Sequence, residues 1–270
     1  MTSRRGFVAV VLVLALSGCQ VFRGAPEAGI PAPRGERVEI TSAAELVREM
    51  RERYDGKWYR TLTFLQNNTR FTTDGREEKS QWMEYMSVPG KLRIEFLPRS
   101  SGSGILFTNG RAYTFEGGRR IDTKRQIHPL VLLTSDVYVL PPSVTLRRLD
   151  SLGVRRSRFR EDRWEGRRVY VVGAAAGDTL SNQLWVDADR LLLVRWIERQ
   201  GTGARRASSD TRLGAYKNIE GQAVPAEITV YRAGRPVFRE VYADVRVNVP
   251  FLPALFEPAR WRNAPRPDTK

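Results

Sequence analysis

The chain has 270 residues, with 45 lysines and arginines against 30 aspartates and glutamates, a formal net charge of +15 at pH 7. Its only cysteine, Cys19, excludes an internal disulfide, and a single histidine, His128, leaves little for metal binding or acid–base catalysis. An excess of basic over acidic residues often indicates nucleic-acid binding. Here the basic residues alternate with apolar ones, as on the wet face of a sheet, so we expect no nucleic-acid partner. Anionic lipid headgroups are the specific partner that this charge favours.

Residues 1–20 read MTSRRGFVAVVLVLALSGCQ, a pattern typical of an export signal. Two arginines precede an apolar run of about ten residues, too short to cross a bilayer, which takes roughly 20. The sequence LSGC at 16–19 resembles the lipobox of bacterial lipoproteins. That resemblance implies removal of a signal peptide spanning 1–18 and attachment of a diacylglycerol to Cys19. The alternative is an ordinary secretory signal with an incidental cysteine.

Residues 19–41 are rich in proline and glycine and predict a flexible tether behind the lipidated residue. An anchor of two or more acyl chains holds a protein stably on its membrane. Gln20 occupies the position where, by analogy with enteric bacteria, an aspartate would favour the inner membrane. We therefore expect the periplasmic face of the outer membrane, with the inner membrane as the alternative.

The first predicted helix begins at Ser42, where Ser-Ala-Ala-Glu fits a capping box. Ala43, Val47, Met50 and Tyr54 follow at helical spacing and give one apolar face. Asp55-Gly56 predicts the end of this helix.

Alternating patterns after residue 57 predict strands that carry Trp58, Leu62 and Phe64, then Trp82 and Met86, then Leu92, Ile94 and Phe96. Arg93 and Glu95 fall on the opposite face of the third strand. Two further strands, with Ile105 and Phe107 on the first, are joined by Asn109-Gly110, a strong hairpin signal. The N-terminal half is thus an antiparallel meander.

Two short helices are predicted within 127–152, where the alternation stops. Pro129 suits a first helical turn, and Leu130, Leu133 and Val137 lie along one stripe. Pro141-Pro142 separates this helix from a second one that Gly153 can end.

Alternation resumes in seven further segments, at 154–159, 168–172, 184–187, 191–199, 211–217, 227–231 and 237–247. Many strands with few helices indicate a mainly β (α+β) fold with a helical insertion. We expect a single domain over 42–258 and a disordered tail over 259–270.

The second half carries an ordered series of motifs that resembles the LolA/LolB-like superfamily of lipoprotein-sorting proteins. The series consists of LWVD at 184–187, a turn, the strand 191–195, Tyr216-Lys217, Gly221, PAEI at 225–228, the strand 245–249, Leu255-Phe256 and Pro258. The resemblance implies a strongly curved antiparallel sheet of about eleven strands, forming an unclosed barrel whose concave side is covered by the N-terminal helix and the inserted helices. It also implies an apolar cavity there that accepts acyl chains of lipids or lipoproteins.

The predicted cavity lining takes the large apolar residues of the N-terminal strands and of the inserted helix. They are Trp58, Leu62, Phe64, Trp82, Leu92, Ile94, Phe96, Ile105, Phe107, Leu130, Leu133 and Val137. The alternative is that these residues simply pack together as core. The chain departs from the family in the loop 98–104, which is polar where membrane-anchored members carry an apolar residue, and in lacking an evident counterpart of the carriers' buried basic residue.

No catalytic or metal-binding pattern is evident in the sequence. His128, before Pro129, fits a surface or capping role better than a general base. Asp187 and Asp189 fit a tight turn better than a cation site. We therefore expect no enzyme, no metal and no cofactor, and a monomeric, lipid-anchored protein that binds acyl chains in lipid or lipoprotein sorting. The alternative is an envelope scaffold or stress sensor that binds protein partners with the same fold.

Overall fold

The computed structural model describes residues 39–201, 207–214 and 216–267. The predicted signal peptide, Cys19 and all but the end of the predicted tether lie outside these residues. No described helix is both long enough and apolar enough to cross a membrane.

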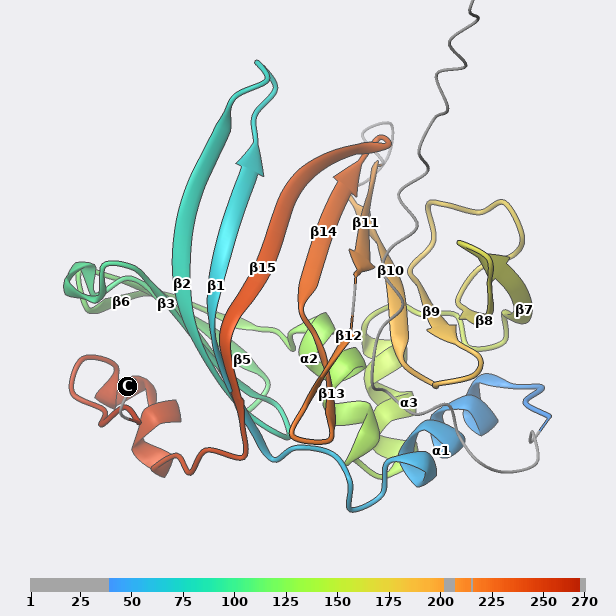
Figure 1. The fold of residues 1–270 in the computed structure, drawn as a ribbon, viewed down its shortest axis with the longest axis horizontal. Coiled ribbons are helices and arrows are strands. Elements are labelled where there is room, and N and C mark those ends of the chain that lie inside the picture. Colours follow the sequence, from blue (N-terminus) through green and yellow to red (C-terminus); the bar gives the residue numbers. More distant parts are fainter. Residues whose placement is uncertain (1–38, 202–206, 215, 268–270) are drawn as a thin grey trace, which may run out of the picture.

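Three α-helices and fifteen strands make up the described chain (Figure 1). The helices are α1 (Ala43–Arg53), α2 (Pro129–Thr134) and α3 (Pro142–Ser151). The strands of the N-terminal half are β1 (Thr61–Phe71), β2 (Glu77–Ser87), β3 (Lys91–Phe96), β4 (Gly104–Thr108), β5 (Arg111–Glu116) and β6 (Arg119–Arg125). The others are β7 (Phe159–Trp164), β8 (Arg167–Val172), β9 (Gln183–Asp187), β10 (Leu193–Gln200), β11 (Ala207–Leu213), β12 (Tyr216–Ile219), β13 (Gln222–Pro225), β14 (Glu227–Arg232) and β15 (Arg235–Val247).

Thirteen strands form one antiparallel sheet in the order β6-β5-β4-β3-β2-β1-β15-β14-β11-β10-β9-β8-β7, and β12 and β13 pair separately. The sheet is open, since β6 and β7 stand at its two ends. It thus has two more strands than the eleven or so expected. One unexpected strand, β6, carries an almost wholly exposed, charged sequence without apolar alternation, so the pattern could not reveal it.

The predicted helix starts at Ser42 and Pro129 and the predicted turn at Asn109-Gly110 are present in the structure. Ser42 caps α1 by accepting the amide of Glu45 at 3.2 Å, although Glu45 reaches back to Thr41 rather than to Ser42 as a capping box requires. Pro129 begins α2. Asn109 and Gly110 both have positive φ, which the tight turn between β4 and β5 requires.

Three predicted strand assignments are wrong. The strand expected at 211–217 is divided, because β11 ends at Leu213, and β12, which begins at Tyr216, belongs to the separate pair with β13. Trp58 precedes β1 and stacks on Tyr138 at a ring separation of 3.8 Å, so it belongs to the connection after α1. The strand expected at 154–159 begins only at Phe159, because Val154 is instead buried beneath the end of α3.

The largest core lies between the concave face of the sheet and the helices, which Figure 1 shows inside the curve of the sheet. A second core lies on the opposite face, where residues 251–264 pack over β2 to β5. Trp261 and Ala264 are only 3% and 2% exposed. The disordered tail expected from residue 259 is therefore wrong for 259–267, because these residues cover an apolar patch on the outer face of the sheet.

Candidate functional site

An apolar cavity lies between the concave face of the sheet and α2. It encloses about 80 Å³ and opens to the solvent. Strands β1, β2, β3, β14 and β15 form its floor, and α2 forms its roof. Its lining consists of Tyr59, Leu62, Phe64, Gln66, Trp82, Glu84, Met86, Leu92, Ile94, His128, Leu130, Val131, Thr134, Pro225, Ile228, Glu240 and Tyr242.

The apolar part of the floor follows from strand alternation. Leu62 and Phe64 on β1 and Leu92 and Ile94 on β3 are spaced two residues apart, so their side chains share the concave face. All four are 6% exposed or less. Covering an apolar surface of this kind with another apolar group is favourable, because it removes both from water.

The roof is a single helix of six residues, α2. His128 caps it, with Nδ1 accepting the Val131 amide at 3.4 Å. The imidazole packs edge-on against Phe107, and burial lowers its pKa from 6.5 to about 4, so it is neutral at pH 7. Leu130, which projects into the cavity, is only half-buried. A short helix with a half-buried leucine can move at lower cost than a long, fully packed one.

One end of the cavity is polar. Gln66 on β1, Glu84 on β2, and Glu240 and Tyr242 on β15 project from three neighbouring strands. Tyr242 donates to Glu240 at 3.2 Å and stacks on Phe64 at a ring separation of 3.9 Å. Burial raises the pKa of Glu240 to about 7. Burial and the nearby Glu240 raise the pKa of Glu84 well above its ordinary value.

All twelve residues predicted to line a cavity lie in the core under the helices or pack against it. Six of them line the cavity, namely Leu62, Phe64, Trp82, Leu92, Ile94 and Leu130. The other six, which are core residues outside its lining, are Trp58, Phe96, Ile105, Phe107, Leu133 and Val137. The cavity thus occupies a smaller part of the core than the sequence predicted.

The polar lining was not predicted from the sequence. A signal was present, because the alternation that places Leu62 and Phe64 on the concave face continues to Gln66. Glu84 lies likewise between Trp82 and Met86, which were both assigned to that face. Glu240 and Tyr242 required knowledge of how β15 pairs with β1, which the strand pattern does not provide.

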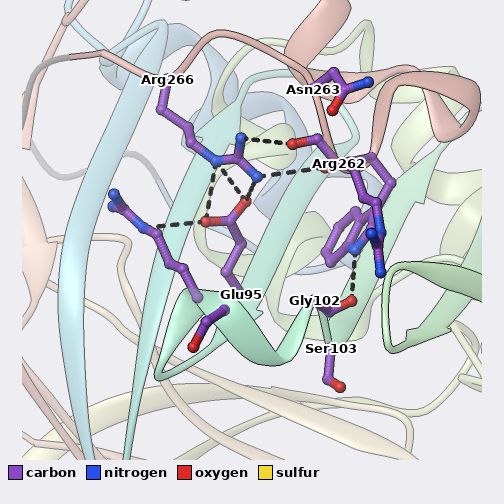
Figure 2. Close-up of a pocket in the computed structure, with 9 residues that line it drawn as sticks. Glu95, Gly102, Ser103, Arg262, Asn263 and Arg266 are labelled. Carbon is purple, nitrogen blue, oxygen red and sulfur yellow. Dashed lines mark hydrogen bonds and ion pairs between the residues drawn. The ribbon is translucent and has the colours of Figure 1, made fainter.

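A second, larger depression of about 290 Å³ lies on the outer face of the sheet (Figure 2). Glu95 sits at its base and is bound by Arg266 at 2.7 Å and Arg99 at 3.3 Å. Arg266 also donates to the backbone carbonyl of Ala264 at 2.8 Å. These arginines are therefore engaged in fastening the C-terminal segment, and the loop 98–104 forms part of that contact.

The described residues contain no group of three or more histidine, cysteine, aspartate or glutamate side chains arranged to hold a metal ion. Asp187 accepts the amides of Asp189 and Arg190 at 2.9 and 2.8 Å, which explains its place in the turn after β9.

The sequence matches no family model and no curated protein. Solved structures do match the fold. A LolA superfamily protein from Nitrosomonas europaea aligns over 81% of this chain and 98% of its own, with a TM-score of 0.52 and 14% identity. A putative outer membrane lipoprotein-sorting protein domain from Vibrio parahaemolyticus aligns over 82% and 98%, with a TM-score of 0.56 and 11% identity. The chain therefore has the LolA-like fold, an open, curved antiparallel sheet with helices on its concave side.

Proposed function

We propose that this protein binds acyl chains of lipids or lipoproteins between its sheet and α2 and takes part in their sorting or transfer at the outer membrane. The observation that carries the proposal is the cavity with apolar walls on the concave face. Each Å² of apolar surface that a ligand buries there contributes about 25 cal/mol. Transfer then needs only a difference in affinity between donor and acceptor, without covalent chemistry.

The cavity is small for a whole chain. Its 80 Å³ is well below the about 300 to 1,000 Å³ of typical ligand pockets, so it holds only the end of an acyl chain. A longer segment requires α2 to move away from the sheet. The shortness of α2 and the partial exposure of Leu130 support such a movement.

The proposal places the protein on a membrane. It includes a signal peptide at 1–18, a lipid on Cys19, a tether to residue 41 and a folded domain that begins with α1. We propose that this anchor keeps the protein, as a monomer, at the periplasmic face of the outer membrane.

Native mass spectrometry of the gently purified full-length protein tests the proposal. We expect a co-purifying lipid, and we expect Leu130→Trp, which fills the cavity from its roof, to reduce the loaded fraction at least fivefold. Leu146→Trp is the matched control, because Leu146 is also a half-buried leucine on a covering helix but does not line the cavity.

A protein that carries no lipid and gains none from mixed phospholipid vesicles would contradict the proposal. Equal loading of the two tryptophan variants would contradict the assignment of the cavity. A lipid-free protein that instead co-purifies with a stoichiometric protein partner would favour the scaffold or sensor.

A further inference from the structure

One carboxyl group in the cavity has no partner. Glu84 is 5% exposed, and its side chain lines the cavity. Among the described residues, no donor or cation binds this carboxyl; the charged group that acts on it is another acid, Glu240. A buried polar group without a partner costs free energy, which a ligand can recover by supplying the partner.

Glu240 reaches the same space from the other side of β1. Phe64 pairs with Glu84 of β2, and Asn68 pairs with Glu240 of β15, so both carboxyls stand on the concave face within one short stretch of β1. Asn68 is 2% exposed, and its amide nitrogen likewise has no hydrogen-bond partner. Two acids thus lie at the polar end of the cavity, and the unsatisfied amide of Asn68 lies beside Gln66, which lines it.

The described lining contains no compensating cation. Neither lysine nor arginine contributes to it, and His128, on the roof, is neutral at pH 7. The other titratable groups of the lining are the phenols of Tyr59 and Tyr242, whose pKa values burial raises. This electrostatic environment disfavours an anion and favours a cation or a hydrogen-bond donor.

We propose that the cavity is selective for amphiphiles that carry a primary amine directly beside the apolar chain, with Glu84 and Glu240 binding the ammonium group and the apolar floor binding the chain. The inference deepens the proposed function and rests on it. Burial shifts both carboxyls toward their protonated forms in the empty cavity. An ammonium ion that enters favours the carboxylate form instead, any proton on the paired carboxyl passes to the solvent, and the carboxylate and ammonium form an ion pair with no net charge.

The head group decides between ligands of equal length. A fatty acid would bring a third carboxyl to the same place, and a phosphate would bring a larger negative charge. An alcohol gains the apolar contacts but forms no ion pair. The amine therefore binds best, and each unit by which it lowers the pKa of its carboxyl partner is worth about tenfold in affinity.

Isothermal titration at pH 8 tests this selectivity with full-length protein carrying Cys19→Ser, so that no attached lipid competes. The probes are dodecylamine, dodecanol and dodecanoic acid, together with propylamine, which has the head group without the chain. We expect dodecylamine to bind at least tenfold more tightly than dodecanol, dodecanoic acid to bind most weakly of the three, and propylamine to show no measurable binding.

Glu84→Gln and Glu240→Gln are the test variants. Each keeps the shape of the side chain, so we expect the preference for dodecylamine over dodecanol to fall about tenfold. Glu78→Gln is the control, because it removes the same charge from an exposed site on the same strand, β2. Thermal unfolding of each variant verifies that it is folded.

Equal affinities for dodecylamine and dodecanol would overturn the inference and leave the proposed function intact. So would an amine preference that survives in both glutamine variants, or tight binding of propylamine, which would indicate a site for free amines. Failure of all three dodecyl probes to bind would overturn the proposed function itself.

Discussion

The guanidinium carbon of Arg93 lies 3.9 Å from the ring centroid of Trp261. This cation–π contact joins β3, a strand inside the sheet, to the C-terminal segment. Arg93 is completely buried. It donates to Glu95 at 2.7 Å and to the carbonyl of Leu255 at 3.1 Å, and also to the carbonyl of Trp261. A buried cation thus organises the outer face, where it supports the sheet without lining the cavity.

Replacement of Trp261 by alanine is expected to lower the free energy of unfolding by about 3 kcal/mol. The indole stacks on Phe115 at a ring separation of 4.2 Å and donates to the carbonyl of Gly102 at 2.9 Å. Trp261→Phe keeps a ring but not the donor, so it should cost only about 1 kcal/mol. Urea unfolding measures both variants, and a loss below 1 kcal/mol for the alanine variant would mean that the segment adds little stability.

Arg93→Met should destabilise the protein by about 2 to 3 kcal/mol, because it removes the donor to the buried Leu255 carbonyl and one of the donors to Glu95 and to the Trp261 carbonyl, both of which Arg266 still contacts. Arg262→Met is the control. Arg262 is exposed and contacts the carbonyl of Gly117, so its loss should change stability by about 0.5 kcal/mol or less. Limited proteolysis should cut residues 251–267 faster in the Arg93 variant alone. Equal cleavage of the two variants would contradict the fastening role of Arg93.

Sequence patterns predicted the elements whose structure is set by neighbouring residues. The start of α1 at Ser42, the start of α2 at Pro129 and the turn at Asn109-Gly110 depend on local capping and backbone conformation. The concave face of β1 to β3 was predicted because apolar alternation there reflects burial directly.

Features that depend on distant contacts were not predictable in the same way. Arg93 and Glu95 have the pattern of a solvated strand face, yet both are buried, because a segment about 160 residues later in the chain covers them. The polar end of the cavity depends on the pairing of β1 with β15. Alternation assigns a residue to one face of a sheet, but it does not identify what lies over that face.

His128→Asn should make the protein more resistant to acid. The histidine pKa is lowered in the folded state from 6.5 to about 4, so the unfolded state binds more protons between these values. Wild-type stability therefore falls by about 3 kcal/mol as the pH drops from 6.5 to 4. Asparagine keeps an acceptor for the Val131 amide and does not titrate. Unfolding midpoints at pH 4 and pH 7 measure the difference, and identical pH profiles for the two proteins would exclude this role.

Glu240→Gln should have the opposite pH dependence. The folded-state pKa of Glu240 is raised from 4.5 to about 7, so between these values the folded state retains a proton that the unfolded state has lost. Stability is consequently greatest below pH 4.5 and falls as the pH rises to 7, by about 3 kcal/mol. The glutamine variant lacks this loss and should be more stable than the wild type at pH 8, while the exposed control Glu78→Gln should follow the wild type. Urea unfolding at pH 4.5, 6 and 8 measures the trend. Because His128 loses stability toward acid and Glu240 toward base, the difference in stability between each variant and the wild type should change with pH in opposite directions for the two variants. A difference that is constant with pH in both variants would contradict the pKa shifts of both groups.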